Sequence, residues 1–148
     1  MPVDDEFLDR ARDVRQLLNG DWFGQILVTL RNGPLHYKVL LAAIQSNSGV
    51  DEWTGEHKKL SGRVLSYDLR RLESAELVSR DEQQGVWPRS VQYGLTPAAE
   101  ELLESMVPVV IWAKKHAELI DRAKQLRRQD HHRTRHKGTA GNQVVDAP

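Results

Sequence analysis

Cysteine is absent from this chain of 148 residues. Its absence excludes disulfides, thiolate metal sites, cysteine nucleophiles and thiol redox switches. Long apolar runs are missing too, because the longest, Val107 to Ala113, has about a third of the length that a bilayer span needs. The acidic start of the chain, with Asp4, Asp5 and Glu6, has the wrong charge for a signal peptide. We therefore expect a cytoplasmic protein without a membrane partner.

An excess of charge of one sign is also missing, since 21 Lys and Arg residues balance 21 Asp and Glu residues. The charges are nevertheless segregated along the sequence. Residues 58–95 and 114–148 are net basic, whereas residues 1–21 and 96–113 are net acidic. The total charge does not indicate a nucleic-acid partner, so only the positions of individual Lys and Arg residues can indicate one.

Catalytic constellations are lacking as well. The sequence contains no nucleophile with an orienting base, no phosphate-cradling glycine loop and no paired carboxylates in an expected cleft. His131, His132 and His136 resemble a metal tract, but no supporting residues surround them, so we expect neither a metal nor another cofactor. The sequence therefore indicates a binding protein and not an enzyme.

Hydrophobic periodicity predicts helices in the first third of the chain. The first is expected over about 4–18, the second over 21–30 with Asp21 as its cap, and the third over 38–44. The third helix is so rich in apolar residues that it should be buried. At most a short strand is expected over 35–37, and the segment 45–59 has no periodicity and reads as a loop.

A hairpin and a long helix are predicted further along the chain. Alternating residues predict strands over 77–81 and 91–95, joined by a long tip over 82–90. Thr96 and Pro97 are typical of a helix start, and Pro108 is expected to kink or restart the helix that follows. We predict one domain over residues 1–126 and a basic, disordered tail over 127–148, which has no apolar pattern.

The helix expected after Ser61 carries the most information. Ser61 is an N-cap candidate, and Leu60 and Leu65 occupy the positions of a hydrophobic staple. Leu65, Leu69 and Leu72 share one face of this helix. The opposite face is cationic and polar, with Arg63, Ser66, Tyr67, Arg70, Arg71 and Ser74.

The order of these elements is typical of a winged helix-turn-helix, in which a cationic helix follows three helices and precedes a hairpin. The cationic helix enters the major groove, and the hairpin tip reaches the flanking backbone or minor groove. The predicted fold class is therefore mainly α with a small β-hairpin wing (α+β), with N- and C-terminal dimerisation helices.

A family resemblance adds to this interpretation. The stretch LSGRVLSYDLRRLESAELVSR, with SVQYGLTPAAEELL and WAKKH further on, resembles the HxlR-type winged-helix regulators of bacteria, which are related to the MarR group. The resemblance covers about residues 20–116 and implies a DNA-binding regulator. The chain departs from the family at residues 45–59, where members have only a few residues, and it lacks the cysteine of the redox-sensing branch.

We predict a sequence-specific transcriptional regulator that binds double-stranded DNA through a recognition helix (about 61–74) and a wing (about 82–90). The predicted DNA-binding residues are Lys58, Lys59, Ser61, Arg63, Ser66, Tyr67, Arg70, Arg71 and Arg89. The alternative is a winged-helix module for protein interaction without specific DNA binding, since the fold serves both uses. The tail is either an inert solvated segment or a clamp on the phosphate backbone.

Two apolar stripes are predicted to form a homodimer interface, because one small domain would struggle to cover them. One lies on the N-terminal helix, and the other is a seam of heptad spacing in the C-terminal helix. The first stripe comprises Phe7, Leu8 and Val14. The second comprises Val109, Trp112, His116, Leu119 and Leu126. An inverted-repeat operator should match the dimer. Four Trp residues and a cleft beside the dimer helix leave room for a small aromatic effector, which no residue identifies.

Overall fold

The computed structural model describes residues 3–47, 49–85 and 87–139. The chain divides into two compact units. The first unit comprises Met1–Ser48 and Lys59–Met106, and the second comprises Gly49–Lys58 and Val107–Pro148.

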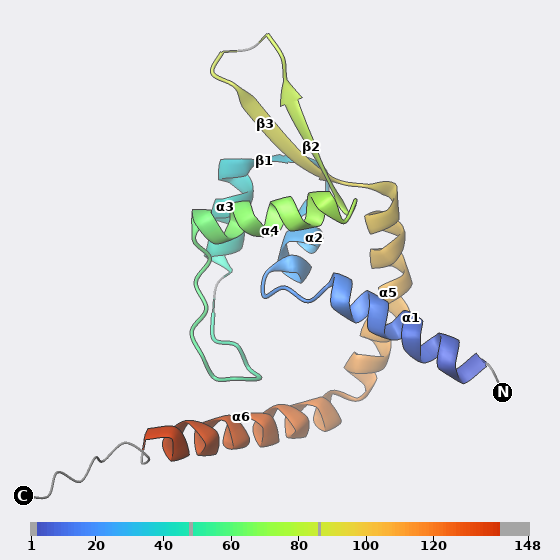
Figure 1. The fold of residues 1–148 in the computed structure, drawn as a ribbon, viewed down its shortest axis with the longest axis vertical. Helices are drawn as coiled ribbons and strands as arrows, with labels where there is room; N and C mark the ends of the chain where they lie inside the picture. The colour runs from blue at the N-terminus through green and yellow to red at the C-terminus, as the bar shows by residue number, and fades with distance from the viewer. Residues whose placement is uncertain (1–2, 48, 86, 140–148) are drawn as a thin grey trace, which may run out of the picture. The chain divides into compact units, whose positions relative to one another are not determined.

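Helices and a small sheet build the first unit (Figure 1). The helices are α1 (Val3–Leu17), α2 (Phe23–Leu30), α3 (Tyr37–Ser46) and α4 (Gly62–Ser74), followed by the start of α5 (Pro97–Lys115). The antiparallel sheet has the strand order β1-β3-β2, with β1 at Leu35–His36, β2 at Val78–Gln83 and β3 at Ser90–Leu95. The fold is thus mainly helical with a β-hairpin wing, which confirms the predicted fold class.

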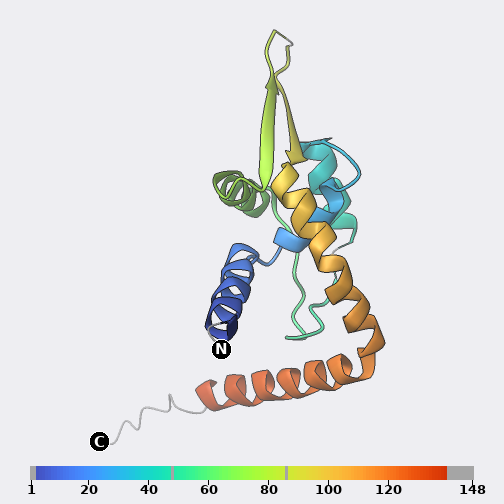
Figure 2. The same cartoon turned by 90° about the vertical axis from the view of Figure 1, so that its right-hand side faces the viewer.

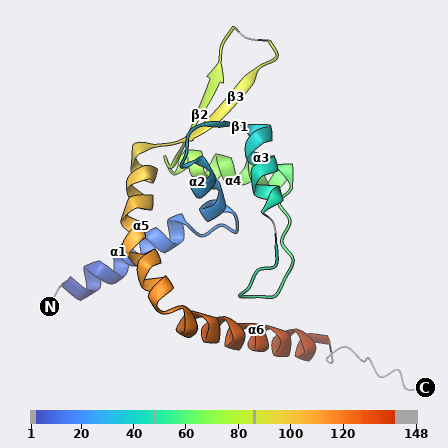
Figure 3. The ribbon, with the colours of Figure 1, turned by 180° about the vertical axis from the view of Figure 1, so that it is seen from behind.

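The core lies where α2, α3 and α4 meet below the sheet (Figure 3). Burying one Leu or Ile side chain contributes about 1.5–3 kcal/mol to stability. The buried side chains of the core therefore decide which face of each helix points inward. The largest fully buried side chains are Ile26, Leu27, Leu30, Leu40, Ile44, Leu60, Leu65, Leu69, Leu72 and Val78. The inward face of α4 is therefore the one that the leucine spacing predicted.

Two predicted caps are confirmed, and one is wrong. The Ser61 hydroxyl accepts a hydrogen bond from the backbone N–H of Val64 at 3.2 Å, and the Thr96 hydroxyl accepts one from Ala99 at 3.3 Å. Asp21 does not cap α2, because this helix begins later than expected and has Trp22 at its N-cap.

The wing is a regular hairpin that projects beyond the helices of its unit (Figure 2). β2 and β3 pair in one register from Val78 opposite Leu95 to Gln83 opposite Ser90. β1 adds a third strand at the base of the hairpin, with Leu35 opposite Tyr93. The predicted hairpin is therefore confirmed, although its strands extend further toward the tip than expected.

The prediction of a buried third helix is wrong. α3 buries Leu40 and Ile44, whereas Val39 on another side of the helix is 51% exposed. A helix that packs against a core on one side leaves its other face in solvent, and an apolar composition does not change this geometry.

In the second unit, α5 gives way to α6 (Ala117–Thr139). Pro108 does not end α5, which runs without interruption to Lys115. The break comes at His116, where the ribbon changes direction (Figure 1). The predicted heptad seam is therefore divided between two helices. The rings of Trp112 and His116 pack at the bend, with 4.8 Å between their centroids.

The prediction of a disordered tail is wrong for residues 127–139, which continue α6. Residues 140–148 of the predicted tail lie outside the described residues. Polar side chains in this part of the helix contact residues 49–58, and such contacts leave no apolar pattern in the sequence. A search of the described part of the chain finds no helix of the length and apolarity that a membrane span needs.

Candidate nucleic-acid interface

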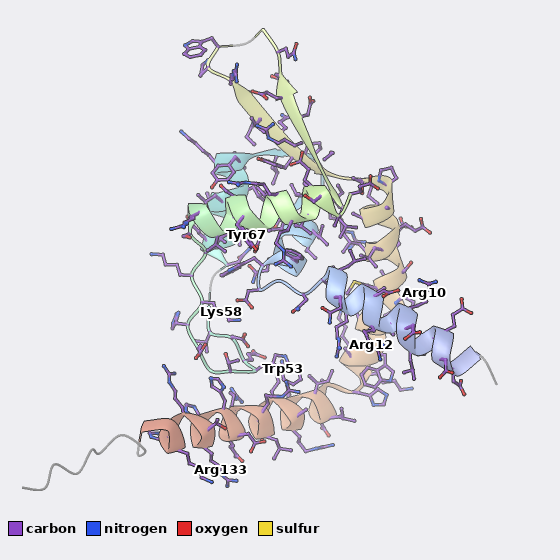
Figure 4. All side chains as sticks on the ribbon, viewed as in Figure 1. Arg10, Arg12, Trp53, Lys58, Tyr67 and Arg133 are labelled. Atoms are coloured by element: carbon purple, nitrogen blue, oxygen red, sulfur yellow. The ribbon has the colours of Figure 1, made fainter. Side chains whose placement is uncertain are left out.

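The outer face of α4 is a cationic surface of the first unit. Arg63, Tyr67 and Arg70 are exposed on it, opposite the buried leucines. Figure 4 shows Tyr67 on this helix, and its side chain is 59% exposed. Neither Arg63 nor Arg70 forms an ion pair with any residue that the structure describes. Both guanidinium groups are therefore available to a ligand.

The Tyr37 hydroxyl connects α3 to the first turn of α4. It donates a hydrogen bond to the carbonyl oxygen of Gly62 at 2.6 Å and accepts one from the Ser66 hydroxyl at 3.1 Å. A Cβ atom at Gly62 would lie 3.1 Å from the Tyr37 oxygen, so glycine permits the close approach. Ser66, which the sequence assigned to DNA, is half-buried in this contact and helps to orient α4.

The Arg71 guanidinium is placed over aromatic rings. Its central carbon lies 4.9 Å from the ring centroid of Phe23 and 5.8 Å from that of Tyr67. Beside it, Asp68 is buried, and burial raises the pKa of its carboxyl group. The positive charge of Arg71 lowers the pKa of Asp68, and the negative charge of Asp21 raises it further. Arg71 thus stabilises the packing of α4 against α2.

The wing brings two arginines to one carboxylate. Glu82 lies 3.4 Å from Arg89 and 3.5 Å from Arg80. Trp87 at the tip is 89% exposed. The sequence prediction included Arg89 but missed Arg80, although the hairpin register places Arg80 opposite Tyr93.

A hollow separates the wing strands from α4. Its lining residues are Ser66, Arg70, Glu73, Arg80 and Tyr93. The recognition helix and the wing therefore share one polar surface within the first unit. Arg80 joins Arg70 on this surface, which the charge pattern of α4 alone did not indicate.

The remaining predicted DNA-binding residues differ in their surroundings. Lys58 belongs to the second unit, and its ammonium group lies 3.1 Å from the Asp51 carboxylate. Lys59 is exposed. The Ser61 hydroxyl is already used as the N-cap of α4.

The residues predicted for a dimer interface are exposed within the chain. Every side chain from Asp4 to Leu17 in α1 is exposed, including Phe7, Leu8 and Val14. In the second unit Val109, Trp112, Leu119 and Leu126 are exposed, and His116 is half-buried. The seam did not include Val107, Val110 and Ile111, which are exposed apolar residues of α5 as well.

The predicted absence of a metal site concerned the histidines of α6. Of these, His131 has its Nε2 atom 3.4 Å from Glu56. Among residues 3–47, 49–85 and 87–139, no group of three or more His, Cys, Asp or Glu side chains is arranged to hold a metal ion.

An exposed cationic helix, held by a tyrosine bridge and followed by a hairpin, defines a winged helix-turn-helix protein. The model of the HxlR-like helix-turn-helix family matches residues 17–121. The chain belongs to this family, which consists of transcriptional regulators and not of enzymes.

Known proteins resemble the chain in sequence or in fold. An uncharacterized HTH-type transcriptional regulator of Methanothermobacter thermautotrophicus is 27% identical over 113 residues, which are 76% of each chain. A MarR-family transcriptional regulator from Enterococcus faecalis V583 has a similar fold, with a TM-score of 0.63 and 23% identity over 78% of this chain and 92% of that chain. The reduced form of the transcriptional regulator YodB from B. subtilis gives a TM-score of 0.58 and 24% identity, covering 72% and 90% of the two chains.

Proposed function

We propose that this regulator binds a specific DNA sequence in the cytoplasm, with α4 in the major groove and the wing on the flanking backbone. The main support is the outer face of α4, where Arg63, Tyr67 and Arg70 are exposed while the opposite face is fully buried. A major groove admits one helix, and an arginine can pair with the O6 and N7 atoms of guanine through two hydrogen bonds.

The contacts divide into base readout and backbone positioning. Arg63, Tyr67 and Arg70 are proposed to reach base edges. Lys58, Lys59 and Arg89 are proposed to contact phosphates, together with Arg80 at the base of the wing. Ser61, Ser66 and Arg71 are proposed to act indirectly, because their polar groups already hold α4 in position.

A gel-shift titration on a duplex from the protein's own promoter, located by footprinting, tests this proposal. Loss of one guanine-reading arginine should cost about 1–3 kcal/mol and relax the preference at one base pair. The double variant Arg63→Ala, Arg70→Ala should therefore lose specific binding. Arg10→Ala, Arg12→Ala removes two arginines from α1 (Figure 4) and is the matched control.

Two results would contradict the proposal. If the Arg63, Arg70 double variant binds as tightly as the control, α4 does not read the DNA. If the wild-type protein binds its promoter no better than scrambled duplexes, the fold serves as a protein-interaction module instead. Circular dichroism of both variants checks whether a loss of binding comes from unfolding.

We further propose that the regulator is a two-fold symmetric homodimer. The uncovered apolar residues of α1 and those of the second unit support this, because large exposed apolar patches mark interaction surfaces. Two equivalent recognition helices require an inverted repeat with half-sites about 10–10.5 bp apart, or a multiple of that spacing. Analytical ultracentrifugation that finds a monomer at micromolar concentration, and still a monomer on DNA, would refute the dimer.

A further inference from the structure

An acidic turn lies along α6 in the second unit (Figure 4). We use the name acidic turn for residues 49–58, which a bridge between Val50 and His57 closes. Inside it, the Asp51 carboxylate accepts hydrogen bonds from the backbone N–H groups of Trp53 at 2.8 Å and Thr54 at 3.3 Å. The turn is therefore a defined structure.

Four side-chain contacts hold the acidic turn on α6. Lys124 forms an ion pair and hydrogen bond with Glu52. Glu56 lies 3.4 Å from His131 and 3.5 Å from Arg135. The fourth is a cation–π contact, in which the Arg127 guanidinium carbon lies 5.6 Å from the ring centroid of Trp53.

The α6 residues in these contacts share one face of the helix, because they recur three or four positions apart. This inner face comprises Lys124, Arg127, Arg128, His131 and Arg135. Arg128 approaches Gly55, since its Cδ atom lies 3.8 Å from where a Cβ atom would stand on that glycine. The pKa of the Glu52 carboxyl is lowered by the hydrogen bond and charge of Lys124 and, to a smaller extent, by Arg128. The positive charge of the inner face therefore acts on the turn.

The positive charge of α6 exceeds what the acidic turn can neutralise. From residue 122 to residue 137, about 24 Å of helix, α6 carries seven Lys or Arg side chains and a single carboxylate, Asp130. The turn supplies three carboxylates and one lysine of its own, Lys58. Arg133 projects from the side of α6 opposite the turn (Figure 4). Such an excess is typical of surfaces that bind a phosphodiester backbone.

We propose that the inner face of α6 binds the DNA backbone and that the acidic turn is its intramolecular competitor. The carboxylates of Glu52 and Glu56 occupy positions that phosphate oxygens take when DNA is bound, because both are anionic acceptors for the same cations. The turn thus weakens the part of binding that carries no sequence information. This inference rests on the proposed DNA-binding function.

Removing the negative charge of the turn without changing its shape tests the inference. The variant Glu52→Gln, Glu56→Gln should bind both promoter and scrambled duplexes more tightly, with scrambled DNA gaining more. Each inner-face cation that reaches a phosphate should steepen the slope of log K against log salt by about 0.9, so two to four contacts steepen it by about 2 to 4. The matched control is Asp9→Asn, Asp13→Asn, which removes two carboxylates from exposed ion pairs on α1.

A reversal variant separates backbone binding from a general change in charge. Arg127→Ala, Arg135→Ala should make the steeper slope of the glutamine variant shallower by about 2, which is about 0.9 for each arginine. In the wild-type background the same pair should change the slope little, because the turn already occupies those arginines. Trypsin cleavage within α6 should be faster in the glutamine variant, and bound DNA should suppress it.

The outcomes separate this inference from the function on which it rests. Promoter-specific binding by the wild type, with the same slope in the glutamine variant as in the control, overturns the inference alone and leaves the turn as a support for α6. Failure of the wild type to bind its promoter overturns the proposed function and the inference together. If the glutamine variant loses helix content, Trp53→Ala takes its place: it loosens the turn at unchanged charge, and an unchanged slope then overturns the inference as well.

Discussion

Replacing Tyr37 with phenylalanine tests how the recognition helix is held. The change removes one oxygen atom and keeps the ring. That oxygen donates a hydrogen bond to Gly62 at 2.6 Å and accepts one from Ser66 at 3.1 Å. Each hydrogen bond contributes about 0.5–1.5 kcal/mol net. The Gly62 carbonyl keeps an acceptor role within the helix, so we expect a loss of about 1–2 kcal/mol in the free energy of unfolding.

A double-mutant cycle isolates the part that belongs to the Tyr37–Ser66 contact. Ser66→Ala alone should cost about 0.5–1.5 kcal/mol. In the Tyr37→Phe background the same change should cost less, because its partner has already gone, and a coupling of about 0.5–1 kcal/mol is expected for residues in contact. Urea denaturation measures all four proteins at one fixed concentration, since the stability of the proposed dimer would depend on concentration.

Tyr37→Phe should also lower the affinity for DNA. The tyrosine bridge orients α4 relative to α3, so Tyr37→Phe should weaken promoter binding without changing which base pairs are preferred. Two results would refute a stabilising role of the Tyr37 hydrogen bonds to Gly62 and Ser66. One is an unfolding free energy of Tyr37→Phe within about 0.3 kcal/mol of wild type, and the other is an equal cost of Ser66→Ala in both backgrounds. A changed base preference would show that Tyr37 itself contacts DNA.

Three further changes test local features of the first unit by urea denaturation. Gly20→Ala should cost about 1–3 kcal/mol, because its Cβ would lie 2.4 Å from the buried ring of Phe23, whereas Gly24→Ala meets nothing within 4 Å and should be tolerated. Ser61→Ala should cost about 1 kcal/mol through loss of the N-cap hydrogen bond. The free energy of unfolding of Asp68→Asn should rise relative to that of the wild type as the pH rises from 4 to 7. Burial raises the folded-state pKa of Asp68, so the stability that its protonated form contributes is lost as the pH rises through that value; a pH-independent difference would contradict this.

The features that sequence could predict depend on residues close together in the chain. Leu65, Leu69 and Leu72 recur at helical spacing, and this spacing alone identifies the buried face of α4. Ser61 and Thr96 cap the helices that follow them directly. The hairpin and the family resemblance have the same local origin, so the fold class was predictable.

The features that sequence could not predict depend on distant partners. Helical angle placed Ser66 and Arg71 on the outer face of α4, but their contacts are Tyr37, 29 residues earlier, and Phe23 on α2. Residues 127–139 likewise have partners in a distant segment, such as Glu56, which forms an ion pair with Arg135. A pattern along one segment identifies a face, and it cannot show which side chains from other segments reach that face.

The contacts between opposite charges in the chain bear on the proposed recognition of DNA. Some of its basic residues are matched to carboxylates: Glu82 contacts both Arg80 and Arg89, and the acidic turn contacts Lys124 and Arg135 of α6. Among the described residues, Arg63 and Arg70 on α4 have no such partner. Because phosphate contacts give binding without sequence information, the internal ion pairs of the wing and of α6 should leave the proposed base-reading helix with a larger share of the affinity. We therefore expect a shallow salt dependence in the wild-type protein, together with a strong preference for its own operator.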